Sequence, residues 1–472
     1  MPDPLMLVHD EIEAGLVKHA ERMTAAKLAR DYAEGRNRAY LEARPQESWA
    51  DYRDRPKRYR RLALYAVGQL CAHLYTPGPV RSWEGDEAVE EYLEATYERL
   101  GINAVMRHAD TLATIGGVCA IETAVEDDGL LRLYTYGADE FTAWTSFRDP
   151  LTPWAVCTKT CDPLDQVTEY RLWTADERRT YRTRSAAGRT AGGRVADQVE
   201  TVPNPLGRLP FTYVWYQPPV DTFWVDGVGG LLAEANADLD RALSDLAQAV
   251  REHLCPIGLA RNVDPRFRLH RIPGGFQVLP KDAAGKTGEG AEPKLEYLQA
   301  IVDVESALRE AESYADATLQ DLGIPLAPAR GDASASSGIA LLIEDLPLLT
   351  RYRSRQPTFA RYESDLARLV ALVGLGRAPA GSLACHWPDV VSILPDATLQ
   401  EADERDLALG LTSRLEILQR RRGITREAAI ELLQRLESDR LEEARIAQGI
   451  LAPEPEAEAE PEAPDETADA VD

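Results

Sequence analysis

Apolar residues recur at helical spacing in the first hundred positions of the chain. The segment 59–77 (YRRLALYAVGQLCAHLYTP) and the segment 25–45 both have this spacing. In the former, five apolar residues lie near one helical face before Thr76 and Pro77 end the pattern: Leu62, Tyr65, Ala66, Leu70 and Leu74. A further helix is predicted over 86–117, with an interruption near Gly101.

The period changes after residue 117. Between 118 and 217, apolar and polar residues alternate in short runs, and EDDG at 126–129 is typical of a hairpin turn. The stretch 185–194 (SAAGRTAGGR) is predicted to be a flexible tip. Residues 118–217 are therefore expected to be mostly antiparallel β structure.

Two long helices are predicted next, at 227–253 and 299–325. In each, apolar residues recur at alternating steps of about three and four, the spacing of a helix that packs along a partner helix. The first stripe is Leu232, Ala235, Leu239, Ala242 or Leu243, Leu246 and Val250, and the second is Ile301, Val304, Leu308, Ala311, Ala315 and Leu319. Helices of about 25 residues would each be about 40 Å long. If they project from the body, their stripes are predicted to pack against neighbouring subunits.

The segment 254–298 between these helices differs in character. It contains RFRLHRIPGGFQVLP, two strand-like runs joined by a Pro-Gly-Gly turn, which predicts a small β-containing head. After Gly338 another helix is expected, but it contains Pro347 and Pro357, which should kink or break it.

A last helical region is predicted over 397–448. Ser413 with Glu416 three residues later forms a capping box, and Thr425 is placed to cap a second helix. From Glu454 onward the chain has nine acidic residues and no basic ones, and its only large apolar residue lies near the very end. Such a composition cannot sustain a core and predicts a disordered tail.

The composition describes a folded protein of several parts. With 472 residues, 44% of them hydrophobic, the chain can bury a sizeable core. No run of about 18 uncharged apolar residues occurs, and residues 1–23 carry acids where a signal peptide would be basic and then apolar, so a soluble, unexported protein is expected. The net charge is −25, and −16 without the nine acids of the tail, which argues against an ordinary nucleic-acid binder.

The motifs do not predict an enzyme. GKT at 285–287 follows a strand-like run, but Pro280 stands where a Walker A loop needs a glycine. The serines of 334–337 do not fit a G-x-S-x-G elbow. Only CTKTC places two cysteines close together, so all six are expected to be reduced, without a metal or other cofactor: Cys71, Cys119, Cys157, Cys161, Cys255 and Cys385.

Three stretches resemble the SPP1-type portal proteins of tailed bacteriophages. In 203–260, a P-x-x-x-G-x-x-P strand leads through a loop to the glycine-containing start of a long helix. In 321–349 (DLGIPLAPARGDASASSGIALLIEDLPLL), a Gly-Ile-Pro turn and a polar loop precede SG-x-AL. YAEGRNRAY at 32–40, followed by the helix from Tyr59, resembles the opening of the family. The ordered set of motifs spans roughly 25–445.

The resemblance implies a multi-part α+β portal fold that assembles as a ring, with twelve subunits expected. The implied parts are N-terminal helices and a β-rich wing (1–226), a first stem helix (227–253), a clip (254–298), a second stem helix (299–325), a tunnel loop (326–337), a kinked helix and wing return (338–396), a helical crown (397–450) and a disordered acidic tail (451–472). The tunnel loop would begin its exit helix near Gly338, capped by Ser336 or Ser337.

The function implied is that of a structural protein. The ring would occupy one capsid vertex of the virion, after assembly in the host cytoplasm, as the channel through which double-stranded viral DNA is packaged and ejected. It would dock the terminase large subunit, the major capsid and scaffold proteins, and a head-completion or adaptor protein, without contacting a membrane. ATP hydrolysis would belong to the terminase, so the chain itself would carry no catalytic site and no cofactor.

Three sets of residues are expected to perform these tasks. The residues that face DNA in the tunnel loop are Arg330, Asp332, Ser334, Ser336 and Ser337. The residues on the channel face of the second stem helix are Asp303, Glu305, Glu310, Glu312 and Asp316. The residues that contact the motor at the clip are Arg266, Arg268, Lys281 and Lys286. Acidic side chains would repel phosphates and let the duplex slide. Arg330, the only basic residue between Leu322 and Arg351, is the expected exception.

Two other classes of function remain open at this stage. A helical scaffold or adaptor protein would share the long helices but form no DNA channel. A nucleotide-driven packaging motor would need an intact Walker A loop followed by an acidic Walker B strand.

Overall fold

The computed structural model describes most of the chain: residues 4–45, 47–126, 128–162, 167–184, 198–254, 257–261, 294–298, 303–325, 338–388, 403–410, 412–422 and 425–447. The chain forms two compact units, Met1–Ile393 and Leu394–Asp472, which are described separately. The fold is mixed α+β. None of the helices in these ranges has an apolar stretch long enough to cross a membrane.

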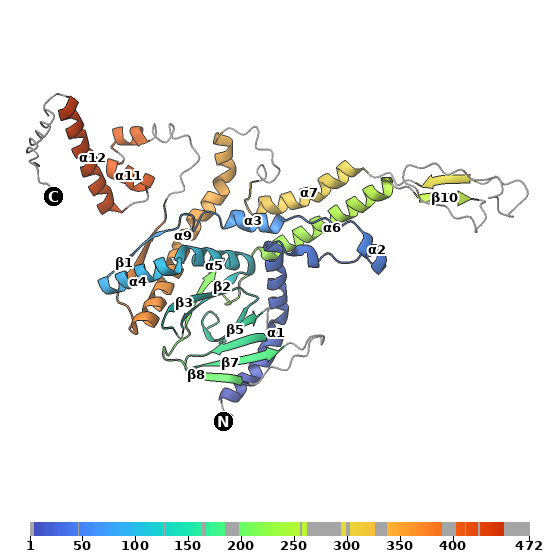
Figure 1. The fold of residues 1–472 in the computed structure, drawn as a ribbon, viewed down its shortest axis with the longest axis horizontal. Coiled ribbons are helices and arrows are strands. Elements are labelled where there is room, and N and C mark those ends of the chain that lie inside the picture. The colour runs from blue at the N-terminus through green and yellow to red at the C-terminus, as the bar shows by residue number, and fades with distance from the viewer. Residues whose placement is uncertain are drawn as a thin grey trace, which may run out of the picture. The chain divides into compact units, whose positions relative to one another are not determined.

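The first unit begins with helices, drawn in blue in Figure 1. Their bounds are α1 (Pro4–Ala33), the 3-10 helix η1 (Asn37–Ala39), α2 (Trp49–Asp54), α3 (Leu62–Leu70), α4 (Glu87–Leu100) and α5 (Ile102–Gly116). Gly101 separates α4 from α5 with a φ of +62°, a conformation that glycine adopts without strain, so the predicted interruption of the 86–117 helix is confirmed.

Residues 118–217 form two antiparallel sheets, as the alternation predicted. The three-stranded sheet has the order β3–β2–β9, and the five-stranded sheet has the order β4–β5–β6–β7–β8. Their strands are β2 (Val118–Val125), β3 (Leu131–Tyr136), β4 (Phe141–Thr145), β5 (Pro153–Asp162), β6 (Val167–Trp173), β7 (Glu177–Arg184), β8 (Gln198–Pro203) and β9 (Phe211–Trp215). The backbone N–H of Gly129 donates to the Glu126 carbonyl in the predicted turn between β2 and β3. An aromatic cluster centred on Phe141, Phe223 and Trp173 joins the two sheets.

The helix α9 (Gly338–Leu375) packs over the three-stranded sheet together with α4 and α5. It runs without interruption through Pro347 and Pro357, so of the predicted kink or break the break is wrong. Phe359 and Leu366 are almost fully buried in the main hydrophobic core. This burial on the C-terminal side of Pro357 offsets the hydrogen bond that the proline removes.

A short strand pair was not predicted from the sequence. β1 (Val80–Glu84) pairs antiparallel with β12 (Ser382–His386), with Trp83 opposite Leu383. Each strand has five residues, and its partner lies about three hundred positions away, so the local pattern contains little trace of the pairing.

Two long helices leave the body of the first unit side by side, and we call α6 and α7 together the helical arm (Figure 1). α6 is Gly229–Leu254, close to the predicted range, whereas α7 is Val304–Asp321, which gives 18 residues rather than the expected 25 or so. Beyond α6, β10 (Ile257–Arg261) pairs antiparallel with β11 (Lys294–Leu298), so the segment between the two helices does contain β structure.

The second unit contains α11 (Arg414–Arg422) and α12 (Arg426–Ala447). The backbone N–H of Glu416 donates to Ser413 Oγ at 3.2 Å, and the backbone N–H of Ser413 donates to Glu416 Oε2 at 2.9 Å. This reciprocal pair is the predicted capping box. The backbone N–H of Ala428 donates to Thr425 Oγ1 at 3.4 Å, so the second predicted cap is also confirmed.

Candidate functional site: the helical arm and its base

The base of α6 carries a stripe of buried polar side chains one helical turn apart: Asn236, Asp240 and Ser244, which are 0%, 2% and 0% exposed. We call these three residues the polar stripe. Each accepts a hydrogen bond from a backbone N–H of residues 58–63, the segment that leads into α3 and its first turn. The distances are 3.1 Å from Ala63 to Asn236 Oδ1, 2.6 Å from Arg60 to Asp240 Oδ1, and 2.9 Å from Arg58 to Ser244 Oγ.

The same stripe also satisfies a backbone carbonyl of this segment. Asn236 Nδ2 donates to the Arg60 carbonyl at 3.2 Å, whereas the single proton of the Ser244 hydroxyl is donated to the Asp240 carbonyl of α6 at 2.7 Å. The stripe therefore holds residues 57–61 (Lys57, Arg58, Tyr59, Arg60 and Arg61) along α6 through the main-chain groups of Arg58 and Arg60. We call residues 57–61 the basic ribbon, because four of the five are basic and the guanidinium groups take no part in these bonds.

Asp240 is the one ionisable member of the stripe. Burial raises the pKa of Asp240 to about 6, because the carboxylate loses its hydration. Hydrogen bonds from the Arg60 N–H and from Asn37 Nδ2, the latter at 2.6 Å, act in the opposite direction. The base of the arm thus contains a carboxylate that is not fully ionised near neutral pH.

Ion pairs extend this attachment along α6. Asp245 pairs with Arg44 and, at 3.3 Å, with Arg55. The side chain of Arg55 is 2% exposed and also lies 3.3 Å from Glu47, so both carboxylates meet a nearly buried guanidinium. Farther along, Arg251 donates to the Asp54 carbonyl at 2.8 Å. Together these contacts fix α6 against the N-terminal helices.

The predicted apolar stripes pack against each other and against the body at the base of the arm. Leu232, Leu239, Ala315 and Leu319 are buried there. Toward the far end α6 is only partly buried, and Val304 at the start of α7 is 40% exposed. The base stripes are therefore covered within one chain, contrary to the prediction that they await a neighbouring subunit, and only the far part offers apolar surface.

The five acids of α7 lie on two different sides of the helix. At about 100° per residue, Asp303 and Glu310 share one side, whereas Glu305, Glu312 and Asp316 lie roughly opposite. All are exposed except Asp316, which is half-buried. One continuous channel face made of all five is incompatible with this spacing.

The local roles of these acids also differ. Asp303 caps the N-terminus of α7 by accepting from the Ser306 N–H at 3.2 Å, and a second bond from the Ser306 hydroxyl at 2.7 Å, together with this one, lowers the pKa of Asp303. Glu305 pairs with Arg309 one turn later. Glu312 and Asp316 line a groove of about 830 Å³ that Arg60 and Arg61 also line.

The remaining expected site residues lie outside the described residues. These are Arg330, Asp332, Ser334, Ser336 and Ser337 of the tunnel loop, and Arg266, Arg268, Lys281 and Lys286 of the clip. The acidic tail at 451–472 and the tip at 185–194 also lie outside them.

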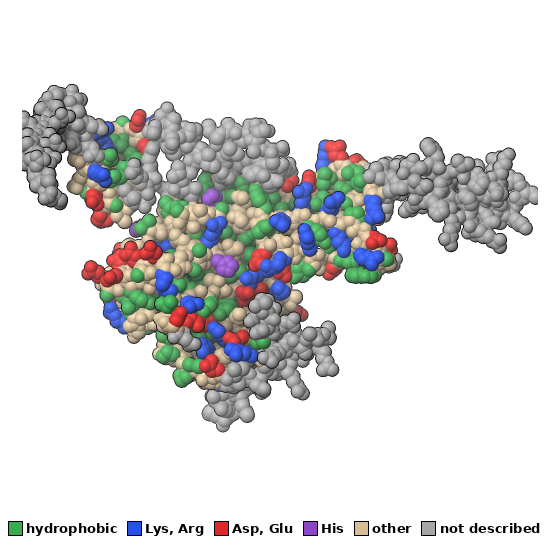
Figure 2. Space-filling view, viewed as in Figure 1, with side chains coloured by type: hydrophobic (Ala, Val, Ile, Leu, Met, Phe, Trp, Pro, Cys, Tyr) green, Lys and Arg blue, Asp and Glu red, His purple; other side chains and the backbone are tan. Residues whose placement is uncertain are grey.

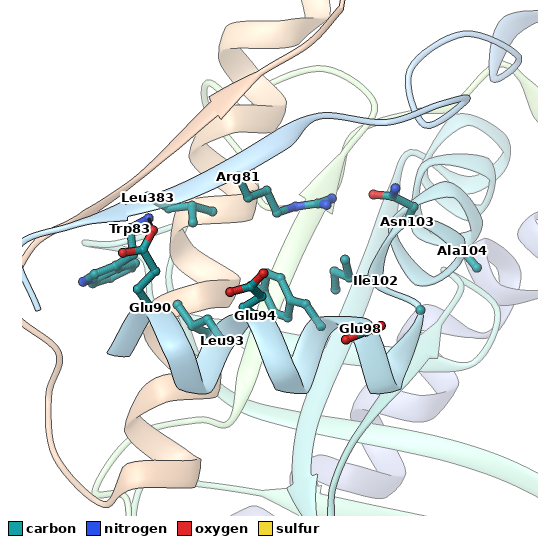
Figure 3. A pocket seen from close by; sticks show the side chains of 12 residues that line it. Arg81, Trp83, Glu90, Leu93, Glu94, Glu98, Ile102, Asn103, Ala104 and Leu383 are labelled. Carbon is teal, nitrogen blue, oxygen red and sulfur yellow. Dashed lines mark hydrogen bonds between the residues drawn. The ribbon is translucent and has the colours of Figure 1, made fainter. Parts of the chain in front are cut away.

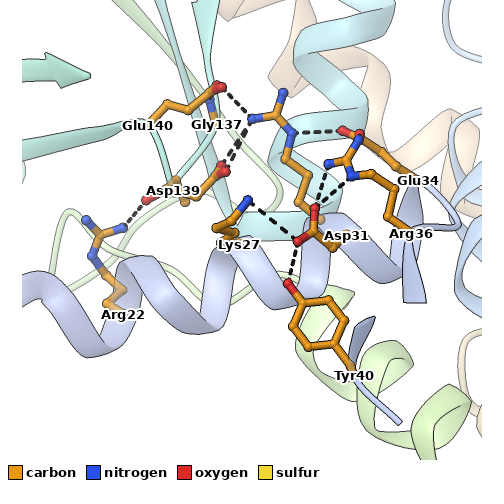
Figure 4. A network of polar contacts seen from close by, with 11 residues as sticks. Arg22, Lys27, Asp31, Glu34, Arg36, Tyr40, Gly137, Asp139 and Glu140 are labelled. Carbon is orange, nitrogen blue, oxygen red and sulfur yellow. Dashed lines mark hydrogen bonds and ion pairs between the residues drawn. The ribbon is translucent and has the colours of Figure 1, made fainter. Parts of the chain in front are cut away.

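A polar network joins α1 to the turn between the two sheets (Figure 4). Arg30 pairs with Asp139 at 3.3 Å and with Glu140 at 2.7 Å. Arg22 donates to the Ala138 carbonyl at 2.7 Å, and its guanidinium stacks 3.5 Å from the centre of the Trp224 ring. Burial lowers the pKa of Arg22 to about 10. This network connects the helical part of the unit to the β sheets.

Two further ion pairs bury charge beneath α9. Asp110 on α5 is fully buried and pairs with Arg355, which also stacks 4.8 Å from the Phe359 ring. Glu363 is fully buried as well, and it accepts from Arg81 at 2.7 Å and from Tyr75 at 3.0 Å. No sequence pattern predicts either pair, because the partners come from elements hundreds of residues apart.

The two cysteines of CTKTC lie on β5. Cys157 is buried and Cys161 exposed on β5, which confirms that CTKTC is a strand. Burial raises the pKa of Cys157 to about 12, so its thiol stays protonated at neutral pH. Within the ranges that the structure describes, three or more His, Cys, Asp or Glu side chains do not gather in a way that could hold a metal ion.

Two solved structures are similar to this chain at low identity. One is a chain of the "Virion of native gene transfer agent (GTA) particle", at 14% identity and a TM-score of 0.40, covering 75% of this chain and 88% of that chain. The other belongs to the "Neck of empty GTA particle computed with C6 symmetry", at 15% identity and a TM-score of 0.41, covering 76% and 88%. No family model and no curated protein matches the sequence.

Proposed function

We propose that this chain is a portal protein, the subunit of a ring at one vertex of a tailed-phage-like capsid. The ring would form the channel for packaging and ejecting double-stranded DNA, without sequence-specific binding and without a catalytic site or cofactor. It would also be the platform on which the terminase large subunit, the capsid and scaffold proteins, and the head-completion or adaptor protein dock. The expected ring contains twelve subunits and belongs to the virion.

The observation that carries this proposal is the helical arm. α6 and α7 run side by side away from the body, and the segment between them contains the β10–β11 pair. This is the order of stem, clip and stem that the resemblance to SPP1-type portal proteins implies. Behind the arm, the β-rich sheets and α9 occupy the positions in the chain where that resemblance expects the wing.

The charge of the arm is consistent with a channel that does not retain DNA. Asp303, Glu310, Glu305 and Glu312 are exposed acids on α7, and the whole chain has a net charge of −25. Because DNA binds proteins mainly through cationic contacts with phosphates, an acidic wall gives little affinity along the path. Since the acids divide between two sides of α7, at most one of the two groups can face the channel.

Electron microscopy of the purified full chain tests the proposal. We expect uniform rings with a central hole, and native mass spectrometry should give one discrete subunit number. Monomers, or open filaments without a hole, would favour the helical scaffold or adaptor alternative. ATP hydrolysis that requires Lys286, measured with Lys286→Ala, would instead indicate a packaging motor.

The expected DNA contact has its own test. Replacing Arg330 by Ala in an infectious clone should alter DNA retention or packaging while rings still form. Replacing Arg353, an exposed arginine on α9, by Ala is a matched control for loss of one positive charge. Unchanged packaged-genome length and stability in the Arg330 variant would count against a role in the channel.

A further inference from the structure

An open acidic cleft lies between α4, the start of α5 and the β1–β12 pair (Figure 3). Its volume is about 640 Å³. Glu90, Glu94 and Glu98 follow one another at four-residue steps along α4 and form one wall. All three are exposed. Apolar side chains line the rest: Trp83, Leu93, Ile102 and Leu383.

Two buried side-chain atoms of the lining residues have no hydrogen-bond partner. Tyr97 lines it and is 6% exposed, and its hydroxyl has no hydrogen-bond partner. Asn103 Oδ1 is likewise buried and unpaired, although Asn103 Nδ2 donates to the Pro77 carbonyl at 3.1 Å. The one basic residue of the lining, Arg81, is engaged with the buried Glu363 at 2.7 Å. The cleft therefore combines three exposed carboxylates with an apolar floor, which suits a segment rich in arginine.

The basic ribbon of this same chain has matching properties. Arg58, Arg60 and Arg61 are exposed, whereas the main chain of the ribbon is held along α6 by the polar stripe. Its backbone is thus ordered before any partner binds, which lowers the entropic cost of association. The ribbon and α4 belong to different sides of the first unit, and Figure 2 shows acidic side chains gathered over the α4 end and basic ones toward the arm.

We propose that the acidic cleft of one copy receives the basic ribbon of the next copy. Two different surfaces meet in such a contact, so it is heterologous, and copies joined in this way close into a ring when the rotation permits. The inference rests on the proposed function for closure of the ring, but the contact itself follows from charge complementarity. DNA is the competing occupant of the ribbon, and it is less suitable because it leaves the acidic cleft without a partner.

The test exchanges the charges of the two surfaces in the full chain. The cleft variant is Glu90→Lys/Glu94→Lys/Glu98→Lys, and the ribbon variant is Arg58→Glu/Arg60→Glu/Arg61→Glu. Each variant alone would place like charges opposite each other, and we expect its self-association to be weaker than wild type by about a hundredfold or more. The two variants mixed together should assemble again, as alternating subunits in equal amounts, which native mass spectrometry can resolve.

Two controls separate the contact from effects on folding. Glu84→Lys/Glu87→Lys/Glu91→Lys reverses three exposed acids that do not line the cleft, and this variant should assemble like wild type. Tyr97→Phe keeps the buried ring and removes only the unpaired hydroxyl. It should keep both the melting temperature and the self-association of wild type, because the hydroxyl is buried and the proposed contact is carried by the carboxylates.

The outcomes distinguish this contact from the proposed function. If the wild type and each of the two charge variants form rings on their own, the proposed contact is wrong and the portal proposal is unaffected. Wild-type protein that stays monomeric would overturn both. If the ribbon variant assembles normally but loses affinity for a DNA duplex in a mobility-shift assay, the ribbon binds nucleic acid instead and the contact is wrong.

Discussion

The buried carboxylate of Asp240 makes the attachment of the helical arm depend on pH. Replacing Asp240 by Asn removes the charge and keeps the size of the side chain and an oxygen that can accept from the Arg60 N–H. The variant stays neutral at every pH, whereas the wild-type carboxylate must ionise inside the base of the arm. The difference between the two proteins as a function of pH therefore reports the ionisation of this one group.

The size of the expected stability difference follows from the pKa shift of Asp240. Burial raises the pKa of Asp240 from its ordinary value of 3.8 to about 6. Because the folded pKa lies above the unfolded one, the stability that this group contributes is fully present below the unfolded pKa and is lost as the pH rises through the folded pKa. A shift of about two units corresponds to about 3 kcal/mol, and about half of this is lost above about pH 5.

Urea denaturation followed by tryptophan fluorescence measures the effect. From about pH 5 to about pH 8, the free energy of unfolding of wild type should fall relative to Asp240→Asn by about 1.5 kcal/mol. Asp238→Asn, which removes a partly exposed carboxylate from the same helix, controls for the change in net charge. Parallel pH profiles for wild type and Asp240→Asn would refute the inference that the carboxylate is forced to ionise in a buried site.

Three further predictions concern single side chains. Replacing Asp110 by Ala should destabilise the first unit by about 3–5 kcal/mol in urea titrations, because Arg355 then stays buried without its carboxylate; a loss below about 1 kcal/mol would contradict this. Gly117→Ala should lower the free energy of unfolding by more than about 3 kcal/mol, since φ is +89° and the new Cβ would lie 1.6 Å from a backbone carbonyl oxygen. In the same urea titrations, Gly230→Ala on α6 should not destabilise the protein, because its new Cβ has no neighbouring atom within 4 Å. Ser413→Ala removes a helix cap worth about 1 kcal/mol and should speed hydrogen exchange in α11 by about fivefold, and unchanged exchange would show that the cap is unimportant.

The elements that the sequence predicts are those set by local periodicity. Stripes such as Leu232, Leu239 and Leu319 belong to helices long enough to show several repeats, and their burial at the base of the arm agrees with the pattern. The turn at 126–129 and the cap at Ser413 are also local, because all their hydrogen bonds join residues within a few positions. Periodicity, turn and cap signals of this kind depend only on neighbouring residues, so they hold independently of the tertiary structure.

The pairings that depend on distant partners could not be predicted in this way. β1 pairs with β12, Arg81 with Glu363, and Asp110 with Arg355, and the residues near each of them in sequence do not indicate which partner it has. The continuity of α9 through Pro357 has the same origin, because the burial that offsets the lost hydrogen bond comes from other elements.

The polar stripe shows why the apolar pattern alone does not reveal how the arm is attached to the body. Asn236, Asp240 and Ser244 interrupt the apolar pattern of α6, and a sequence pattern treats such residues as a solvated face. The one available signal was their own spacing of four residues, which places them on a single face next to the apolar stripe.

A buried stripe of this kind costs more to form than an apolar one, because each group must be desolvated. In return it fixes the register between α6 and the basic ribbon, since three side chains meet three particular backbone N–H groups, and a shift by one residue would leave all three unpaired. Leucine contacts alone would tolerate such a slip. The contact proposed between copies, in which arginines of the basic ribbon meet the carboxylates of α4, would require that fixed register, which would account for the cost of burying polar groups at the base of the arm.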